Sequence, residues 1–159
     1  MSVDLKLKKL TAAEISRETH GELQIYNGAD SEKQQSAIST DSRESGEGVI
    51  FCAIKGQNVD GNDFIPSAVG AGADCFICQY VPEEAKKSGK PFCAIIVEDT
   101  IKAMGDLAAY YRGFSSAKFV AVTGSVGKTT TKEFIYAVAS ASFKTHKTQG
   151  NYNNELGLP

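Results

Sequence analysis

The sequence contains no tryptophan, four prolines and four cysteines in 159 residues, and it has no long uninterrupted apolar run. A helix that spans a bilayer needs roughly 18 or more consecutive apolar residues, so we expect no membrane insertion. The N-terminus, Met1 to Lys6, lacks the apolar core and cleavage site of a secretory signal. We therefore expect the protein in the cytoplasm.

An excess of positive charge is also missing. Lys and Arg number 17 and Asp and Glu number 19, which gives a net charge of -2 at pH 7. Nucleic-acid-binding domains normally show a basic excess, so no nucleic-acid partner is expected. Hydrophobic residues make up 42% of the chain and charged residues 23%, which is typical of a soluble globular protein.

The four cysteines, Cys52, Cys75, Cys78 and Cys93, all lie in apolar stretches. Cys75 and Cys78 have the spacing of a metal knuckle, but no second pair follows at the distance of a zinc site. Positions three apart in a strand also point to opposite faces of a sheet. We therefore predict reduced thiols that are buried in the core.

The predicted elements are those of an α/β protein. Thr11 and Glu14 form a capping-box pattern at the start of a helix that ends by Gly21. Strands are predicted at 23–26, 36–39, 48–54, 74–78 and 92–97, and helices at 63–69 and from Thr100 onward, with a charged connector at 81–91. We place a domain boundary between residues 98 and 99, which gives domains 1–98 and 99–159.

The most informative segment is a glycine loop followed by Lys128 and Thr129. An apolar stretch at 118–121 is predicted as a strand before it, and residues 132–138 are predicted as a helix after it. This arrangement cradles nucleotide phosphates, because backbone N–H groups of the loop and of the helix N-terminus point at the anion. The common pattern has a glycine where Val122 stands. A glycine turn beside a chance lysine is the alternative, and the position of Gly-Lys-Thr-Thr-Thr at the helix start disfavours it.

Three segments resemble the Mur ligase family. Ser39–Arg43, together with 51–56 and 60–64, is similar to the N-terminal domain, and 123–133 is similar to the ATP loop. Residues 150–159 resemble an asparagine-rich segment of the D-alanyl-D-alanine-adding branch. Between the ATP loop and this segment, residues 143–145 are predicted as a strand. The ATP loop alone also fits other Mur ligases and folylpolyglutamate synthetases. Asn62 stands where that branch often has a histidine.

The resemblance implies a small α/β substrate-binding domain, followed by the start of a P-loop-type parallel-sheet ATPase domain. It implies that ATP phosphorylates the terminal carboxylate of a UDP-N-acetylmuramoyl-tripeptide, and that D-alanyl-D-alanine attacks the acyl phosphate to form an amide. Lys128 would be the catalytic residue, and Thr129 would bind Mg²⁺. The full-length protein would be a monomer. The ATP-binding residues implied are Gly124, Ser125, Val126, Gly127, Lys128, Thr129 and Thr130. The substrate-binding residues implied are Thr40, Asp41, Ser42, Arg43, Lys55, Gly56, Asn151, Asn153 and Asn154.

The substrate residues could also have no binding role. Residues 41–43 are compatible with a simple polar turn between strands, and asparagines are common in loops. One strand–helix–strand unit leaves the faces of a parallel sheet uncovered. We therefore expect the chain to be the N-terminal part of a longer protein and to be inactive alone. Three other functions stay open: another Mur-type ligase, a P-loop kinase or NTPase, and a non-catalytic UDP-sugar-binding or protein-binding module. Binding of a UDP-muramoyl peptide would favour the ligase over the kinase.

Overall fold

The computed structural model describes residues 2–148. The chain divides into two compact units between Ser115 and Ser116. The first unit contains, in chain order, β1 (Ser2–Asp4), α1 (Ala12–Thr19), β2 (Glu22–Tyr26), β3 (Ala37–Ser39), η1 (Ser42–Glu44), β4 (Val49–Cys52), η2 (Gly61–Phe64), α2 (Ile65–Gly70), β5 (Cys75–Cys78), α3 (Glu83–Lys86), β6 (Phe92–Ile96) and α4 (Thr100–Arg112). The regular element described in the second unit is α5 (Lys128–Ser140).

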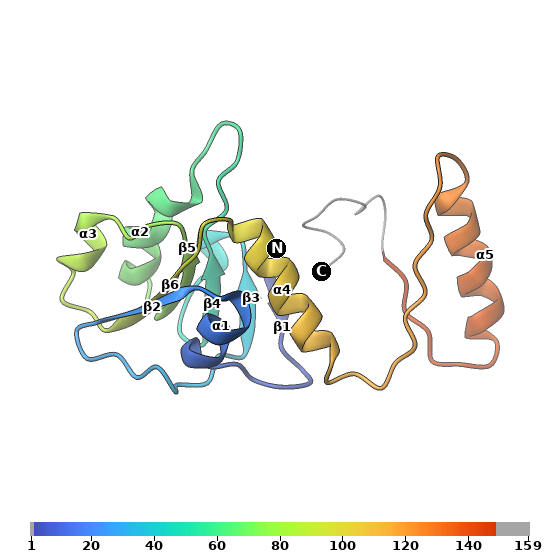
Figure 1. Cartoon of the computed structure of the whole chain (residues 1–159), viewed down its shortest axis with the longest axis horizontal. Helices are drawn as coiled ribbons and strands as arrows, with labels where there is room; N and C mark the ends of the chain where they lie inside the picture. Colours follow the sequence, from blue (N-terminus) through green and yellow to red (C-terminus); the bar gives the residue numbers. More distant parts are fainter. Residues whose placement is uncertain (1, 149–159) are drawn as a thin grey trace. The chain divides into compact units, whose positions relative to one another are not determined.

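A six-stranded sheet forms the centre of the first unit (Figure 1), with the strand order β1-β3-β4-β5-β6-β2. Strands β3, β4, β5 and β6 are parallel to one another. The edge strands β1 and β2 pair antiparallel with β3 and β6. This mostly parallel sheet with helices confirms the α/β fold class, while the three-residue strand β1 was not predicted.

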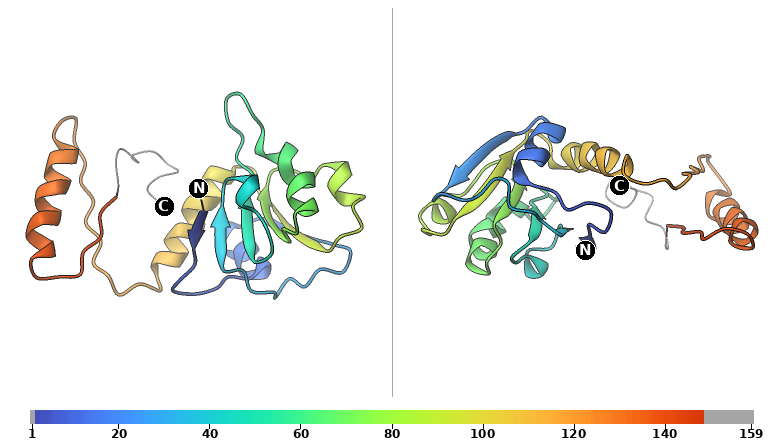
Figure 2. Two further views of the ribbon diagram at one scale, coloured as in Figure 1. Left: turned by 180° about the vertical axis from the view of Figure 1, so that it is seen from behind. Right: turned by 90° about the horizontal axis from the view of Figure 1, so that it is seen from below.

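Helices cover both faces of the sheet. Figure 2 shows α1 and α4 on one face and α2 and α3 on the other. Side chains alternate accordingly along β5, where Cys75 and Ile77 belong to the first core and Phe76 and Cys78 to the second. Because both faces are buried, the strands read as continuous apolar runs. All four cysteines are buried and free, and Cys75 and Cys78 lie on opposite faces, as the spacing predicts.

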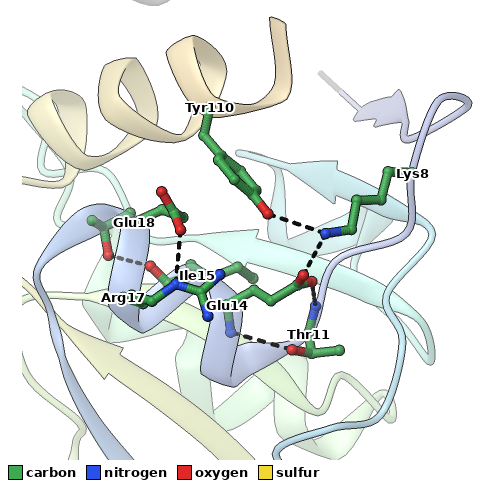
Figure 3. A network of polar contacts seen from close by, with 8 residues as sticks. Lys8, Thr11, Glu14, Ile15, Arg17, Glu18 and Tyr110 are labelled. Carbon is green, nitrogen blue, oxygen red and sulfur yellow. Dashed lines mark hydrogen bonds and ion pairs between the residues drawn. The ribbon is translucent and has the colours of Figure 1, made fainter. Parts of the chain in front are cut away.

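Helix α1 begins with the predicted capping box (Figure 3). The Thr11 hydroxyl accepts a hydrogen bond from the Glu14 amide at 3.2 Å, and the Glu14 carboxylate accepts one from the Thr11 amide at 3.2 Å. The other carboxylate oxygen of Glu14 pairs with Lys8, whose Nζ donates to the Tyr110 hydroxyl at 3.0 Å. The start of α1 is therefore tied both to the N-terminal segment and to the end of α4.

Helix α4 begins at Thr100, as predicted, but it belongs to the first unit. Its Ala103 and Leu107 are 2% and 5% exposed and lie in the same core as Ile15 and Ile77. The structural division therefore falls after residue 115, whereas the sequence predicts a boundary between 98 and 99. An apolar helix face indicates that the helix is buried, but it does not identify the sheet that the helix covers.

The strands predicted at 118–121 and 143–145 are wrong for this structure: within 116–148 neither segment takes part in a ladder. Phe119, Val120 and Phe143 are 56%, 71% and 74% exposed. A strand needs a ladder with a neighbouring strand and a covered face to stabilise it, and within residues 2–148 neither segment belongs to a ladder and their large apolar side chains are mostly exposed. Among the described residues, no helix is both long and apolar enough to cross a membrane.

Candidate functional site

The carboxyl ends of the four parallel strands meet along one edge of the sheet. The turn at 40–43 follows β3, the loop that starts at Ala53 follows β4, and Gln79 and Val97 follow β5 and β6. Ligands of open α/β sheets bind outside these carboxyl ends. The structure therefore brings two predicted substrate segments, 40–43 and 55–56, to one edge that suits ligand binding.

Asp41 and Arg43 form a two-pronged ion pair in the turn after β3. The guanidinium Nε and Nη2 of Arg43 donate to the two carboxylate oxygens of Asp41 at 2.9 and 2.6 Å. The Asp41 carboxylate also caps η1 by accepting from the Arg43 amide at 3.0 Å. These hydrogen bonds from Arg43 hold the pKa of the Asp41 carboxyl well below its usual range. The Arg43 side chain is nevertheless 87% exposed, so an incoming anion can reach the guanidinium.

Two serines that are absent from the predicted site residues, Ser39 and Ser45, stabilise this turn. The Ser39 hydroxyl is buried; it accepts from the Asp41 amide at 3.0 Å and contacts Glu44 at 3.1 Å. The Ser45 hydroxyl donates to the Asp41 carbonyl at 3.2 Å. Thr40 and Ser42 are half-buried between them. A cluster of Ser, Thr and Asp is the signal for such a turn, since these side chains bond the local backbone.

Lys55 and Gly56 begin a short hairpin in the loop after β4. Lys55 forms an antiparallel bridge with Asp60, and their Nζ and Oδ2 atoms are 4.0 Å apart. The Gly56 amide donates to the Val59 carbonyl at 2.8 Å. Because the hairpin itself uses the Gly56 amide, the exposed Lys55 ammonium is the group of this pair that remains accessible to a ligand. The Lys55 side chain is 67% exposed.

A hollow of about 260 Å³ lies beside this hairpin. Its lining residues are Lys55, Gln79, Glu98, Asp99, Thr100 and Ile101. The Asp99 carboxylate caps α4 by accepting from the amides of Ile101 and Lys102 at 2.8 and 3.0 Å. Gln79 donates from Nε2 to the Glu98 carbonyl at 2.8 Å. Lys55 is the cationic side chain among these lining residues, and Glu98 and Asp99 are the acidic ones.

The glycine loop of the second unit leads directly into α5. Gly124 and Gly127 have φ values of 146° and 81°, a region that a side chain with a Cβ rarely adopts. Gly127 is the N-cap of α5, and its carbonyl accepts the first helical hydrogen bond from the Thr131 amide at 2.8 Å. The preceding amides, those of 128–130, have no carbonyl partner within the helix and point out of its N-terminus. Together with the helix dipole they form an anion-binding end.

Lys128 folds back over the loop, and its Nζ donates to the Gly124 carbonyl at 2.6 Å. The seven predicted ATP-loop residues therefore form one continuous loop and first helical turn. Thr129 offers an exposed hydroxyl there, which fits Mg²⁺ as a single protein ligand because this ion keeps several waters and binds phosphate oxygens. Among residues 2–148, no group of three His, Cys, Asp or Glu side chains could hold a metal. Asn151, Asn153 and Asn154 lie outside the described residues.

Comparison with known proteins gives the same assignment for both units. Residues 35–112 match the description "Mur ligase family, catalytic domain", and 122–159 match "Mur ligase middle domain". The UDP-N-acetylmuramoyl-tripeptide–D-alanyl-D-alanine ligase of Synechocystis is 43% identical over 122 residues, which are 77% of this chain and 26% of the relative.

Two solved structures are also similar. MurF from Acinetobacter baumannii has a TM-score of 0.75 and 34% identity, with coverage of 94% of this chain and 32% of that one. The MurF ligase from Thermotoga maritima in complex with ADP has a TM-score of 0.66 and 37% identity, with coverage of 76% and 27%. This chain spans about a third or less of the length of these relatives. Because both units match the same family in sequence and relatives with this fold match in structure, the chain belongs to the Mur ligase family.

Proposed function

We propose that the chain is part of an ATP-dependent ligase that adds D-alanyl-D-alanine to UDP-N-acetylmuramoyl-tripeptide in peptidoglycan precursor synthesis. The observation that carries the proposal is the Asp41–Arg43 turn with the Lys55 hairpin along one carboxyl edge of a parallel sheet. Relatives whose names state this activity support the choice of substrates.

In this proposal the first unit recognises the UDP-sugar end of the substrate. The Arg43 guanidinium suits a pyrophosphate because its planar donors can bond two oxygens at once. The hydroxyls of Thr40 and Ser42 can donate to and accept from the edges of uracil. Arg43 would exchange Asp41 for the ligand's phosphates, so Asp41 both orients the guanidinium and competes with the ligand.

The second unit would bind ATP. The amides of the loop and of the first turn of α5 would hold the phosphate oxygens, and Lys128 would leave the Gly124 carbonyl to hold the β- and γ-phosphates. Mg²⁺, held in part by the Thr129 hydroxyl, would supply further positive charge there. We also propose that Asn151, Asn153 and Asn154 contact nucleotide or peptide groups through their amides.

The chemistry consists of two transfers. The γ-phosphoryl group moves from ATP to the terminal carboxylate of the tripeptide, which gives ADP and an acyl phosphate. The amine of D-alanyl-D-alanine then attacks the acyl carbon, so that an amide forms and phosphate leaves. Positioning and charge neutralisation carry most of the catalysis of such transfers. Because ATP and the UDP-linked tripeptide are nucleotide metabolites, we place the enzyme in the cytoplasm, and we propose a monomer for the full-length protein.

Calorimetric titration of the chain with a UDP-muramoyl tripeptide tests the proposal, with UDP and the free tripeptide as controls. We expect binding that requires the UDP portion and weakens about tenfold or more in Arg43→Ala, because a charge-assisted hydrogen bond contributes about 1.5–3 kcal/mol. Arg17→Ala is the matched control, since Arg17 is an exposed arginine that pairs with Glu18 on α1. Absence of binding in a sample shown to be folded would refute the proposal.

A further inference from the structure

Asn62 is a polar side chain among the largest fully buried side chains of the described chain. It lies in η2 and is 0% exposed, while nearly all side chains of comparable burial and size are apolar. Burying an amide is unfavourable unless its donors and acceptor are hydrogen-bonded. The hydrogen bonds of the buried Asn62 side chain therefore identify the segments that it connects.

The two ends of the Asn62 amide reach two different loops. Its Nδ2 donates to Asp60 Oδ1 at 2.6 Å, and its backbone N–H donates to the same oxygen at 2.9 Å. Its Oδ1 accepts from the backbone N–H of Gln79 at 3.0 Å. The backbone N–H of Gln79 can only donate a hydrogen bond. It therefore fixes the orientation of the Asn62 side-chain amide, so that Nδ2 faces the Asp60 carboxylate.

Both bonded partners connect to the hollow at the carboxyl edge. Asp60 is the bridge partner of Lys55, and Gln79 itself lines the hollow and donates to the Glu98 carbonyl. The chain has little room to move here, because a Cβ on Gly61 would lie 2.6 Å from the backbone N and O of Ile54. One buried amide therefore holds the base of the Lys55 hairpin against the end of β5.

We propose that Asn62 is a positioning residue that holds Lys55 beside the hollow for an anionic group of the UDP-linked ligand. The proposal rests on the proposed function, because it needs that ligand. Asn62 itself touches no ligand in this proposal. It acts through Asp60, and Asp60 keeps Lys55 at the rim of the hollow. Without the amide, the hairpin would lose its attachment to β5, and Lys55 would sample positions away from the ligand.

The test is a double-substitution cycle on the chain, with the dissociation constant for UDP-muramoyl tripeptide as readout. We expect Lys55→Ala and Asn62→Ala each to raise this constant about tenfold, the effect of losing one charge-assisted contact. The double variant should bind no more weakly than either single variant, because Asn62 acts through Lys55. Tyr80→Phe is the control: it removes a nearby exposed hydrogen bond to Asp63 and should leave the constant unchanged.

Circular dichroism establishes whether each variant is folded. If Asn62→Ala does not fold, Asp60→Ala breaks the same connection from the other side of the bond and takes its place in the cycle. If Asn62→Ala raised the dissociation constant by the same factor in the Lys55→Ala background as in the unaltered chain, the inference would be overturned. A general structural defect would give such additive losses of binding free energy. An unchanged constant in a folded Asn62→Ala or Lys55→Ala variant would overturn it while leaving the proposed function intact. Failure of the unaltered chain to bind would overturn the proposed function and this inference together.

Discussion

Helix α4 offers a direct test of where the first unit ends. Leu107 is 5% exposed and packs in the core beneath the sheet that includes Ile77 and Ile95. Replacing a buried leucine with alanine removes transfer free energy and leaves a cavity, which together cost about 2–5 kcal/mol. If α4 is part of the first unit, Leu107→Ala should destabilise that unit by this amount.

The assay is urea unfolding of a chain that ends at Ser115, with and without the substitution. With a slope of about 1–3 kcal/mol per molar urea, a loss of about 3 kcal/mol lowers the midpoint by about 1–3 M. The control is Lys102→Ala, also on α4. The Lys102 ammonium pairs with Asp106 at 2.6 Å, and its side chain is 70% exposed, so its removal should cost less than about 1 kcal/mol.

The competing boundary gives a different result. If α4 belonged with the second unit, a chain ending at residue 98 would unfold at the same urea concentration as one ending at 115, and Leu107→Ala would leave the midpoint unchanged. Either result would refute the assignment of α4 to the first unit. Hydrogen exchange at the amides of β5 and β6 gives a second reading, since these strands contact the core that α4 covers.

Four further outcomes are expected. Gly105 lies inside α4 with open space where a Cβ would be, so Gly105→Ala should stabilise the chain by about 0.5–1 kcal/mol in urea unfolding. Gly61→Ala should instead destabilise the chain by about 1–3 kcal/mol, because the added Cβ would collide with the Ile54 backbone. Lys128→Ala should weaken ATP binding about tenfold or more in calorimetry without changing the melting temperature, since this lysine is exposed; unchanged affinity would exclude a phosphate-binding role. Burial raises the pKa of the Cys52 thiol to about 12, while an unfolded thiol ionises near about 8.5. The unfolded state therefore loses its proton first, and stability should fall from about pH 9 to 12, by up to about 1.4 kcal/mol per pH unit for this group. A Cys52→Ala variant whose urea midpoint falls just as steeply over this range would contradict that cause.

Local rules predicted much of the first unit. The capping box at Thr11 and Glu14 is a short-range feature, and it occurs as predicted. The opposite directions of Cys75 and Cys78 follow from the two-residue repeat of a strand. Features that depend on distant partners were missed or misplaced, including the unit to which α4 belongs and the edge strand β1.

The strands predicted at 118–121 and 143–145 show why the second unit was harder. Their composition favours β-structure, but strand preference mainly reflects packing against neighbours. Phe119 and Phe143 are more than half exposed, so that packing is missing. The glycine loop and the start of α5 depend on local geometry, and the sequence indicated both.

The residues of the candidate site divide into two kinds, and the sequence indicates only one of them. Arg43 and Lys55 carry charge, are exposed and belong to recognisable segments, so a motif points to them. Ser39 and Asn62 hold the turn and the hairpin from buried positions. Ser39 bonds the nearby Asp41 amide, whereas only the fold shows that Asn62 bonds Gln79, 17 residues away. This division has a physical consequence. Replacing an exposed charge should change ligand affinity with little change in stability, whereas replacing a buried, fully bonded polar group should lower both, because its partners lose their hydrogen bonds inside the protein.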